Sequence, residues 1–207
     1  MRESGRLAMT PLARVERRLG RNDRGSVAVE AGFIFPVLVL ILFGVVEFSM
    51  LLRDHVALTA ATRSGVRTAS ALPREMTAGS AAALAVDRAG TAMPMSIVEE
   101  LWIYKANTAG YPGANGVTSF ATCPTNSCNT YAFDSGTRSF VQTSGSWDYR
   151  RVDACVGTSD SVGIYVRARH SMVTGLFGVG MDIGDHAVMR FEPIPADQLA
   201  AGQSCRG

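Results

Sequence analysis

The longest apolar segment lies near the amino terminus of the chain. Residues 31–46 carry no polar side chain, and apolar neighbours on both sides extend the run to about 26 residues over 27–52. A helix of that length, at about 1.5 Å per residue, exceeds the ~30 Å hydrocarbon core of a bilayer. The pattern therefore predicts a transmembrane helix over residues 26–52, in which Glu30 and Glu47 are the only charged residues.

Two helical segments are expected after this span. Residues 53–71 keep a helical spacing of apolar and small side chains, so the same helix is predicted to continue until Pro73 ends it. The alanine-rich residues 77–89 predict a second helix, which stops before Gly90 and Pro94.

Strand patterns dominate the chain from Met95 onwards. Residues 162–170 alternate apolar and polar side chains, which is typical of a half-buried strand. Further β-prone segments lie at 97–105, 130–133, 140–142 and 186–191. The expected fold class is α+β, with a long amino-terminal transmembrane helix followed by a small antiparallel β-sheet domain.

The two glutamates of the span require an explanation. They are 17 positions apart, so at 100° per residue they return to one helix face, within about 20° of each other. A charge near the middle of a membrane costs roughly 3 kcal/mol, so an acidic residue inside the span needs a partner or a function. For Glu47 a position at the headgroup interface is sufficient, whereas the residues before Glu30 indicate a function.

Charge is distributed unevenly along the chain. Residues 1–25 contain seven arginines and three acidic residues, a net charge of +4, which leaves −2 for the remainder of a chain whose total is +2. Basic residues stay on the cytoplasmic side of membrane helices, so a cytoplasmic amino terminus and an exported carboxy-terminal domain are predicted. A nucleic-acid-binding arm is not expected, because the arginines lead directly into an apolar span and no basic fold follows.

A cleaved secretory signal is the main rival interpretation of the amino terminus. Such signals have an apolar core of 7–15 residues followed by small residues at the cleavage site. Here the apolar core is longer and runs on into residues 47–52, which read EFSMLL. Cleavage by signal peptidase is therefore not expected.

The residues in front of Glu30 form a recognisable pattern. Basic residues precede Gly25 and Ser26, and Glu30 follows the glycine by five positions at the head of the apolar helix. This arrangement resembles the processing site of type IV prepilins. Together with Pro36 and the run FGVVEF at 43–48, the segment from about residue 24 to 67 resembles the TadE-like minor pseudopilins of tight-adherence (Tad/Flp) pilus systems.

The resemblance implies a mechanism. A prepilin peptidase would cut between Gly25 and Ser26, and the Glu30 carboxylate would neutralise the new amino terminus of a neighbouring subunit. Glu30, Pro36 and Glu47 would take part in helix–helix assembly, with Pro36 acting as a functional bend or only as a harmless kink. The expected partners are the cytoplasmic membrane, the peptidase, other pilins and pseudopilins, and Tad assembly proteins.

The same resemblance implies a pilin-like organisation at the bacterial cytoplasmic membrane, crossed once. The expected parts are a basic cytoplasmic leader (1–25), the transmembrane helix (26–52), an exported helical region (53–94), a β-rich exported domain (95–195) and a tail (196–207). After TadE-like proteins, TadF-like proteins are the next candidate family. A TadG-like protein is not expected, because the DxSxS metal motif is missing from the sequence. The alternative function is an uncleaved, membrane-anchored protein with an exported binding domain.

All four cysteines fall in the part predicted to be exported, where an even number indicates two disulfides. Of three pairings, the simplest joins Cys123 to Cys128 and Cys155 to Cys205. A zinc site is not expected, because the spacing lacks paired CxxC motifs.

Catalytic motifs are missing from the sequence. His55, His170 and His186 are the only histidines, and neither a P-loop nor a GxSxG motif is present. An enzyme, a cofactor, a metal ion and a small-molecule substrate are therefore not expected, and the histidines of predicted strands are interpreted as structural. Trp147 and Tyr149 are either contact residues on a loop or part of the core.

Overall fold

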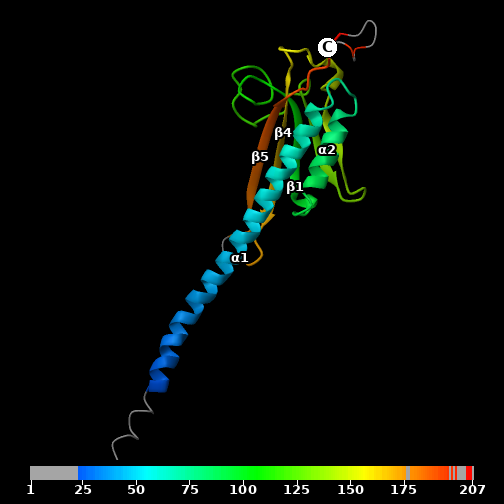
Figure 1. Ribbon diagram of the computed structural model, residues 1–207. Helices are drawn as coiled ribbons and strands as arrows, with labels where there is room; N and C mark the ends of the chain where they lie inside the picture. The colour runs from blue at the N-terminus through cyan, green and yellow to red at the C-terminus, as the bar shows by residue number, and fades with distance from the viewer. Residues whose placement is uncertain (1–22, 176–177, 196, 198, 200–203, 207) are drawn as a thin grey trace, which may run out of the picture. The chain divides into compact units, whose positions relative to one another are not determined.

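The computed structural model describes residues 23–175, 178–195, 197, 199 and 204–206. The chain divides into two compact units, residues 1–46 and residues 47–207. Along the described chain the elements are α1 (Asp23–Ser70), α2 (Ala78–Ala89), η1 (Met95–Ile97), β1 (Val98–Ala106), β2 (Cys128–Asp134), β3 (Ser139–Gly145), η2 (Tyr149–Arg151), β4 (Ser161–Ser171) and β5 (Gly180–Arg190) (Figure 1).

The described part of the amino-terminal unit belongs to α1. Its apolar side chains are exposed, including Phe33, Ile34 and Leu38, and none of its most apolar 18-residue window is buried. In water such a surface would be strongly unfavourable, at about 25 cal/mol per Å² of apolar area. By length and composition the helix is suited to cross a membrane. Pro36 lies inside it, as the sequence requires.

A five-stranded antiparallel sheet forms the framework of the carboxy-terminal unit. Its strand order is β3-β2-β1-β4-β5, so the central strand β1 pairs with β2 on one side and β4 on the other. The α+β class expected from the sequence is confirmed. Every predicted strand is present, although the expectation for the last one was wrong in its limits: residues 186–191 were predicted and the strand is Gly180–Arg190.

The reason for that difference is tertiary. The first half of β5, GMDIGD, contains two glycines and two aspartates, which are poor strand formers on their own. Eleven residue pairs with β4, from Ser171 with Gly180 to Ser161 with Arg190, hold the segment as a strand. Pairing with the long neighbouring strand therefore overrides the local preference.

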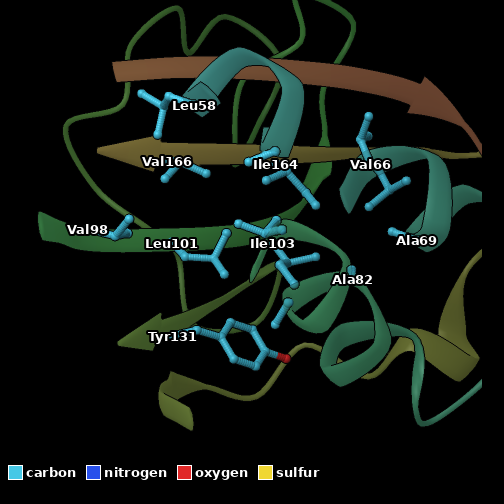
Figure 2. Packing of buried hydrophobic residues seen from close by; sticks show 14 of the residues in the cluster. Leu58, Val66, Ala69, Ala82, Val98, Leu101, Ile103, Tyr131, Ile164 and Val166 are labelled. Carbon is cyan, nitrogen blue, oxygen red and sulfur yellow. The ribbon is translucent and has the colours of Figure 1, made fainter. Parts of the chain in front are cut away.

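The main hydrophobic core lies between one face of the sheet and the two helices. Leu58 and Val66 of α1 and Ala82 of α2 pack over Ile103 of β1 and Ile164 of β4, and all five are buried (Figure 2). Small side chains on both helices let them approach the sheet closely. The alanine-rich composition that predicted α2 thus also explains how α2 fits.

The opposite face of the sheet is covered by the connection between β1 and β2. Phe120 in this connection stacks on Tyr165 of β4 with ring centroids 4.2 Å apart, and it makes an edge contact with Trp102. The Cys123–Cys128 disulfide ties the end of the connection to β2. A segment that the sequence predicts as a loop is therefore fixed by aromatic contacts and a covalent link.

Trp147 and Tyr149 belong to the core and are not exposed contact residues. Both are buried, and the Tyr149 hydroxyl lies 3.1 Å from that of Tyr131. Burial raises the pKa of both tyrosines above the usual value, since an ionised phenol would lose its hydration. Of the two interpretations left open by the sequence, the structure selects the core.

The second disulfide, Cys155–Cys205, holds the carboxy-terminal tail against the segment before β4. The Ala154 amide donates a hydrogen bond to the Cys205 carbonyl at 2.9 Å, and the Ile194 amide donates one to the Ala154 carbonyl at 2.9 Å. The structure has the pairing that the sequence offered as the simplest.

Gly65 marks the closest approach of α1 to α2, and a larger residue there is expected to destabilise the unit. A Cβ atom at Gly65 would lie 2.5 Å from Val86 Cγ2 and 2.8 Å from Ile164 Cδ1. Gly65→Val should therefore lower the free energy of unfolding by about 1–3 kcal/mol, measured by denaturant titration of the full chain in detergent micelles. Ala60→Val, on an exposed position of the same helix, is the control and should cost less than about 1 kcal/mol. Equal losses would contradict the packing explanation.

Candidate processing and membrane-proximal site

The residues of the expected processing site lie in the first turns of the described part of α1. Gly25, Ser26 and Glu30 are all exposed. Apart from its chain neighbours and the backbone of its own helix, no described heavy atom lies within 4 Å of a Cβ built on Gly25, and its backbone is helical, not left-handed. Glycine in a helix costs about 1 kcal/mol relative to alanine. The fold of the described residues therefore provides no reason for a glycine at this position.

Glu30 follows one and a half turns after Gly25. Its side chain is exposed and makes no hydrogen bond or ion pair with any residue that the structure describes. The apolar side chains around it are exposed as well, among them Val27, Val29 and Ile34. This part of α1 thus presents a single acidic group on an apolar surface.

Glu47 has different surroundings from Glu30. Its side chain is only 3% exposed, and it accepts hydrogen bonds from the backbone amide and from the hydroxyl of Thr174, the latter at 2.8 Å. Its second oxygen, Oε2, is buried and has no hydrogen-bond partner among the described residues. The carboxylate thus binds the β4–β5 connection of its own chain, a contact that the sequence did not indicate.

A second buried acidic residue lies two helical turns further on. Asp54 Oδ2 is 2.8 Å from His170 Nδ1, and the two side chains are 4% and 5% exposed. Because a carboxylate only accepts hydrogen bonds, the imidazole proton of this contact is on Nδ1. Arg53 donates from Nε and Nη2 to the other oxygen, Oδ1, at 3.2 and 3.0 Å. His170 Nε2 is buried without a described partner.

Glu47, Asp54, His170 and Thr174 together form a polar junction between α1 and the end of the sheet where β4 finishes. We call these four residues the membrane-proximal junction. The sequence analysis singled out Glu47 and treated His170 as structural, but it missed Asp54 and Thr174. One signal was present: Glu47 and Asp54 are seven residues apart, which places them on the same helix face. Their partners are more than a hundred residues away in the chain, so local patterns do not reveal them.

These side chains can hold α1 and the end of the sheet together. Among the residues the structure describes, no group of three or more histidine, cysteine, aspartate or glutamate side chains is placed to hold a metal ion. Buried hydrogen bonds to carboxylates fix the relative position of two elements, since removal of the donor leaves the carboxylate without compensation.

An exposed apolar helix suited to span a membrane, followed by a disulfide-bonded antiparallel sheet unit, is the organisation of an α+β protein with a membrane anchor at its amino-terminal end. A model of the family described as TadE-like protein matches residues 25–67. The match confirms the resemblance seen in the sequence and indicates a protein related to Tad pili. TadE-like proteins are a structural and assembly family and are not known as enzymes.

The match begins at Gly25 and ends in the last turns of α1. It therefore covers Gly25, Ser26 and Glu30, the apolar span and most of the α1 part of the core, but neither α2 nor the sheet. No curated protein and no solved structure matches the chain.

Proposed function

We propose that this chain is a minor pseudopilin of a Tad/Flp pilus system, cut by a prepilin peptidase between Gly25 and Ser26. The observation that carries the proposal is the unexplained glycine at the first residue of the family match. Gly25 has open space around its α-carbon and a helical backbone, so the fold does not require it. A peptidase that must approach the backbone closely does require a small residue.

The structure also indicates what cleavage demands of the substrate. The Gly25–Ser26 bond lies within α1, so the helix must unwind locally before the bond can enter an active site. Because glycine is a poor helix former, by about 1 kcal/mol relative to alanine, it lowers the free energy of this unwinding. Gly25 thus serves the peptidase both by its size and by its weak preference for a helix.

Glu30 serves the step after cleavage. The new amino terminus at Ser26 carries a positive charge at the edge of the hydrocarbon, and an exposed carboxylate on a neighbouring helix neutralises it. At low dielectric such an attraction is far stronger than at a protein surface. Assembly then uses Glu30 and the exposed apolar face around Pro36, whereas Glu47 is occupied by Thr174 of its own chain.

In this proposal the basic leader stays in the cytoplasm and the sheet unit is exported, in agreement with the charge asymmetry of the sequence. The two disulfides support an oxidising location for residues 123–205. The partners are the cytoplasmic membrane, the prepilin peptidase and other pilus subunits. The second candidate, an uncleaved anchored protein with an exported binding domain, shares the orientation and differs in keeping residues 1–25.

The mass of the chain recovered from membranes distinguishes the two candidates. We expect a mature protein that begins at Ser26 in cells that process other prepilins, detected by intact mass and amino-terminal sequencing. Gly25→Val should block processing and reduce piliation, because the side chain obstructs access to the scissile bond.

Gly32→Val is the matched control, since Gly32 lies in the same helix and a Cβ at this position would likewise have no heavy atom within 4 Å. It should be processed normally. Recovery of the wild-type chain with Met1 still attached, in a strain that processes its other pilus precursors, would overturn the proposal.

A further inference from the structure

The described residues of the connection between β4 and β5, 172–175 and 178–179, carry no charge and are partly or fully exposed. From Ser171 to Met181 the sequence contains no charged residue. Among the described residues of this segment, Val173 is 68% exposed and Val179 is 86% exposed. Single exposed valines are common on protein surfaces, so the significance of these two depends on what lies next to them.

Thr174 holds this connection at a defined height along α1. Its amide and hydroxyl donate to Glu47, a residue of the predicted transmembrane span. The neighbouring helix residues Phe48 and Leu52 are 65% and 51% exposed, and Phe48 and Leu52 line a shallow apolar groove with Ile183 of β5. Through Thr174, the connection that carries the exposed valines therefore lies next to Glu47, the residue before Phe48.

Charged side chains begin immediately beyond the apolar segment. Arg169 and Asp182, on either side of the connection, form an ion pair of 3.0 Å, and both are about half exposed. On the helix, Arg53 is the first basic residue after the span, and its side chain is 52% exposed. Both the sheet and the helix thus change from apolar to charged at corresponding positions, which is the polarity profile of a membrane interface.

We infer that Val173 and Val179 of the β4–β5 connection contact the lipid of the membrane that α1 crosses. The contact lies at interfacial depth, because the irregular backbone of a connection needs water or protein partners for its amides and carbonyls. Glu47 supplies one such partner through its bonds to Thr174. The carboxy-terminal unit then has a lipid contact of its own, in addition to its covalent link to the membrane span.

This inference rests on the membrane anchorage of α1 but not on its processing by a peptidase. The test uses the full chain in vesicles of phosphatidylcholine whose acyl chains carry bromine, which quenches tryptophan fluorescence on contact. Val179→Trp and Val173→Trp report on the connection. The native Trp102 and Trp147 are buried and contribute a constant background, measured with the unsubstituted chain.

Val156→Trp is the matched control. Val156 is 78% exposed and lies beyond the other end of β4, a strand of 11 residues and hence roughly 36 Å long. Ile41→Trp, in the middle of the span, tests the anchorage itself. We expect the added fluorescence of Val179→Trp and Val173→Trp to be quenched about twofold or more above that of Val156→Trp, and that of Ile41→Trp to be quenched most.

The other outcomes of the quenching experiment separate the lipid contact of the connection from the membrane anchorage of α1. Quenching of Ile41→Trp, together with equal weak quenching at positions 156, 173 and 179, would overturn the lipid contact and leave the anchorage intact. Failure to quench Ile41→Trp would overturn both. Protection of the connection that increases with the ratio of protein to lipid would assign this surface to a second copy of the chain and would also overturn the inference.

Discussion

Replacing Cys155 and Cys205 together by alanine is expected to lower the free energy of unfolding of the carboxy-terminal unit by about 4 kcal/mol. The disulfide closes a loop with a sequence separation of 50 residues, and loop-closure entropy of the unfolded chain predicts that value. The measurement is denaturant unfolding of the full chain in detergent micelles, followed by tryptophan fluorescence. Trp102 and Trp147 are buried in this unit, so the signal reports its unfolding.

The other disulfide provides the control. Cys123 and Cys128 are separated by only 5 residues, for which the same relation predicts about 2 kcal/mol. The double alanine variant at these positions should therefore lose about half as much stability. If the short loop costs as much as the long one, restriction of the unfolded chain is not the main contribution of the Cys155–Cys205 bond.

The second large effect is expected at the membrane-proximal junction. His170→Ala removes the partner of Asp54 Oδ2 and leaves a carboxylate oxygen buried without a hydrogen bond. Breaking a buried pair in this way costs about 3–5 kcal/mol. Arg53 still compensates the other oxygen, so we expect a loss at the lower end of that range, measured by the same unfolding titration.

The burial of the two side chains, and not the mere presence of a contact between them, should decide how much stability is lost. Arg169 and Asp182 form a pair of similar length, 3.0 Å, but both are about half exposed. Asp182→Ala should therefore cost less than about 1 kcal/mol. In a double-mutant cycle, Asp54→Ala and His170→Ala should couple by about 1–3 kcal/mol, and independent effects of the two substitutions would contradict a direct interaction.

The junction explains how acidic residues are used along one helix. The sequence predicts that Glu30 and Glu47 lie on one helix face, yet the two side chains have different surroundings in the structure. Glu30 is exposed and available to a neighbouring subunit, whereas Glu47 binds Thr174 and is withdrawn from such contacts. The helix-assembly role expected for Glu30, Pro36 and Glu47 remains a proposal, and Glu47 has in addition a contact within its own chain.

Most secondary structure was predictable, because it follows from local patterns. The long helix follows from an unbroken apolar run, the second helix from an alanine-rich composition, and β4 from alternating apolar and polar side chains. β5 was predicted only in part, since its glycines and aspartates have little strand preference and depend on pairing with β4. The same distinction applies to the candidate site. The processing pattern around Gly25 is contiguous in the sequence and could be predicted, whereas the partners of Glu47 and Asp54 lie far away in the sequence and could not.

The amino-acid sequence by itself determined the membrane span, the α+β class, the even set of cysteines on one side of it and the resemblance around Gly25. These features depend on composition and on spacings of a few residues. Only the tertiary structure decided that Glu47 and Asp54 are buried, that His170 and Thr174 bind them, and that Trp147 and Tyr149 lie in the core. Burial and hydrogen bonding depend on residues brought together from distant parts of the chain, and no local period encodes which ones meet.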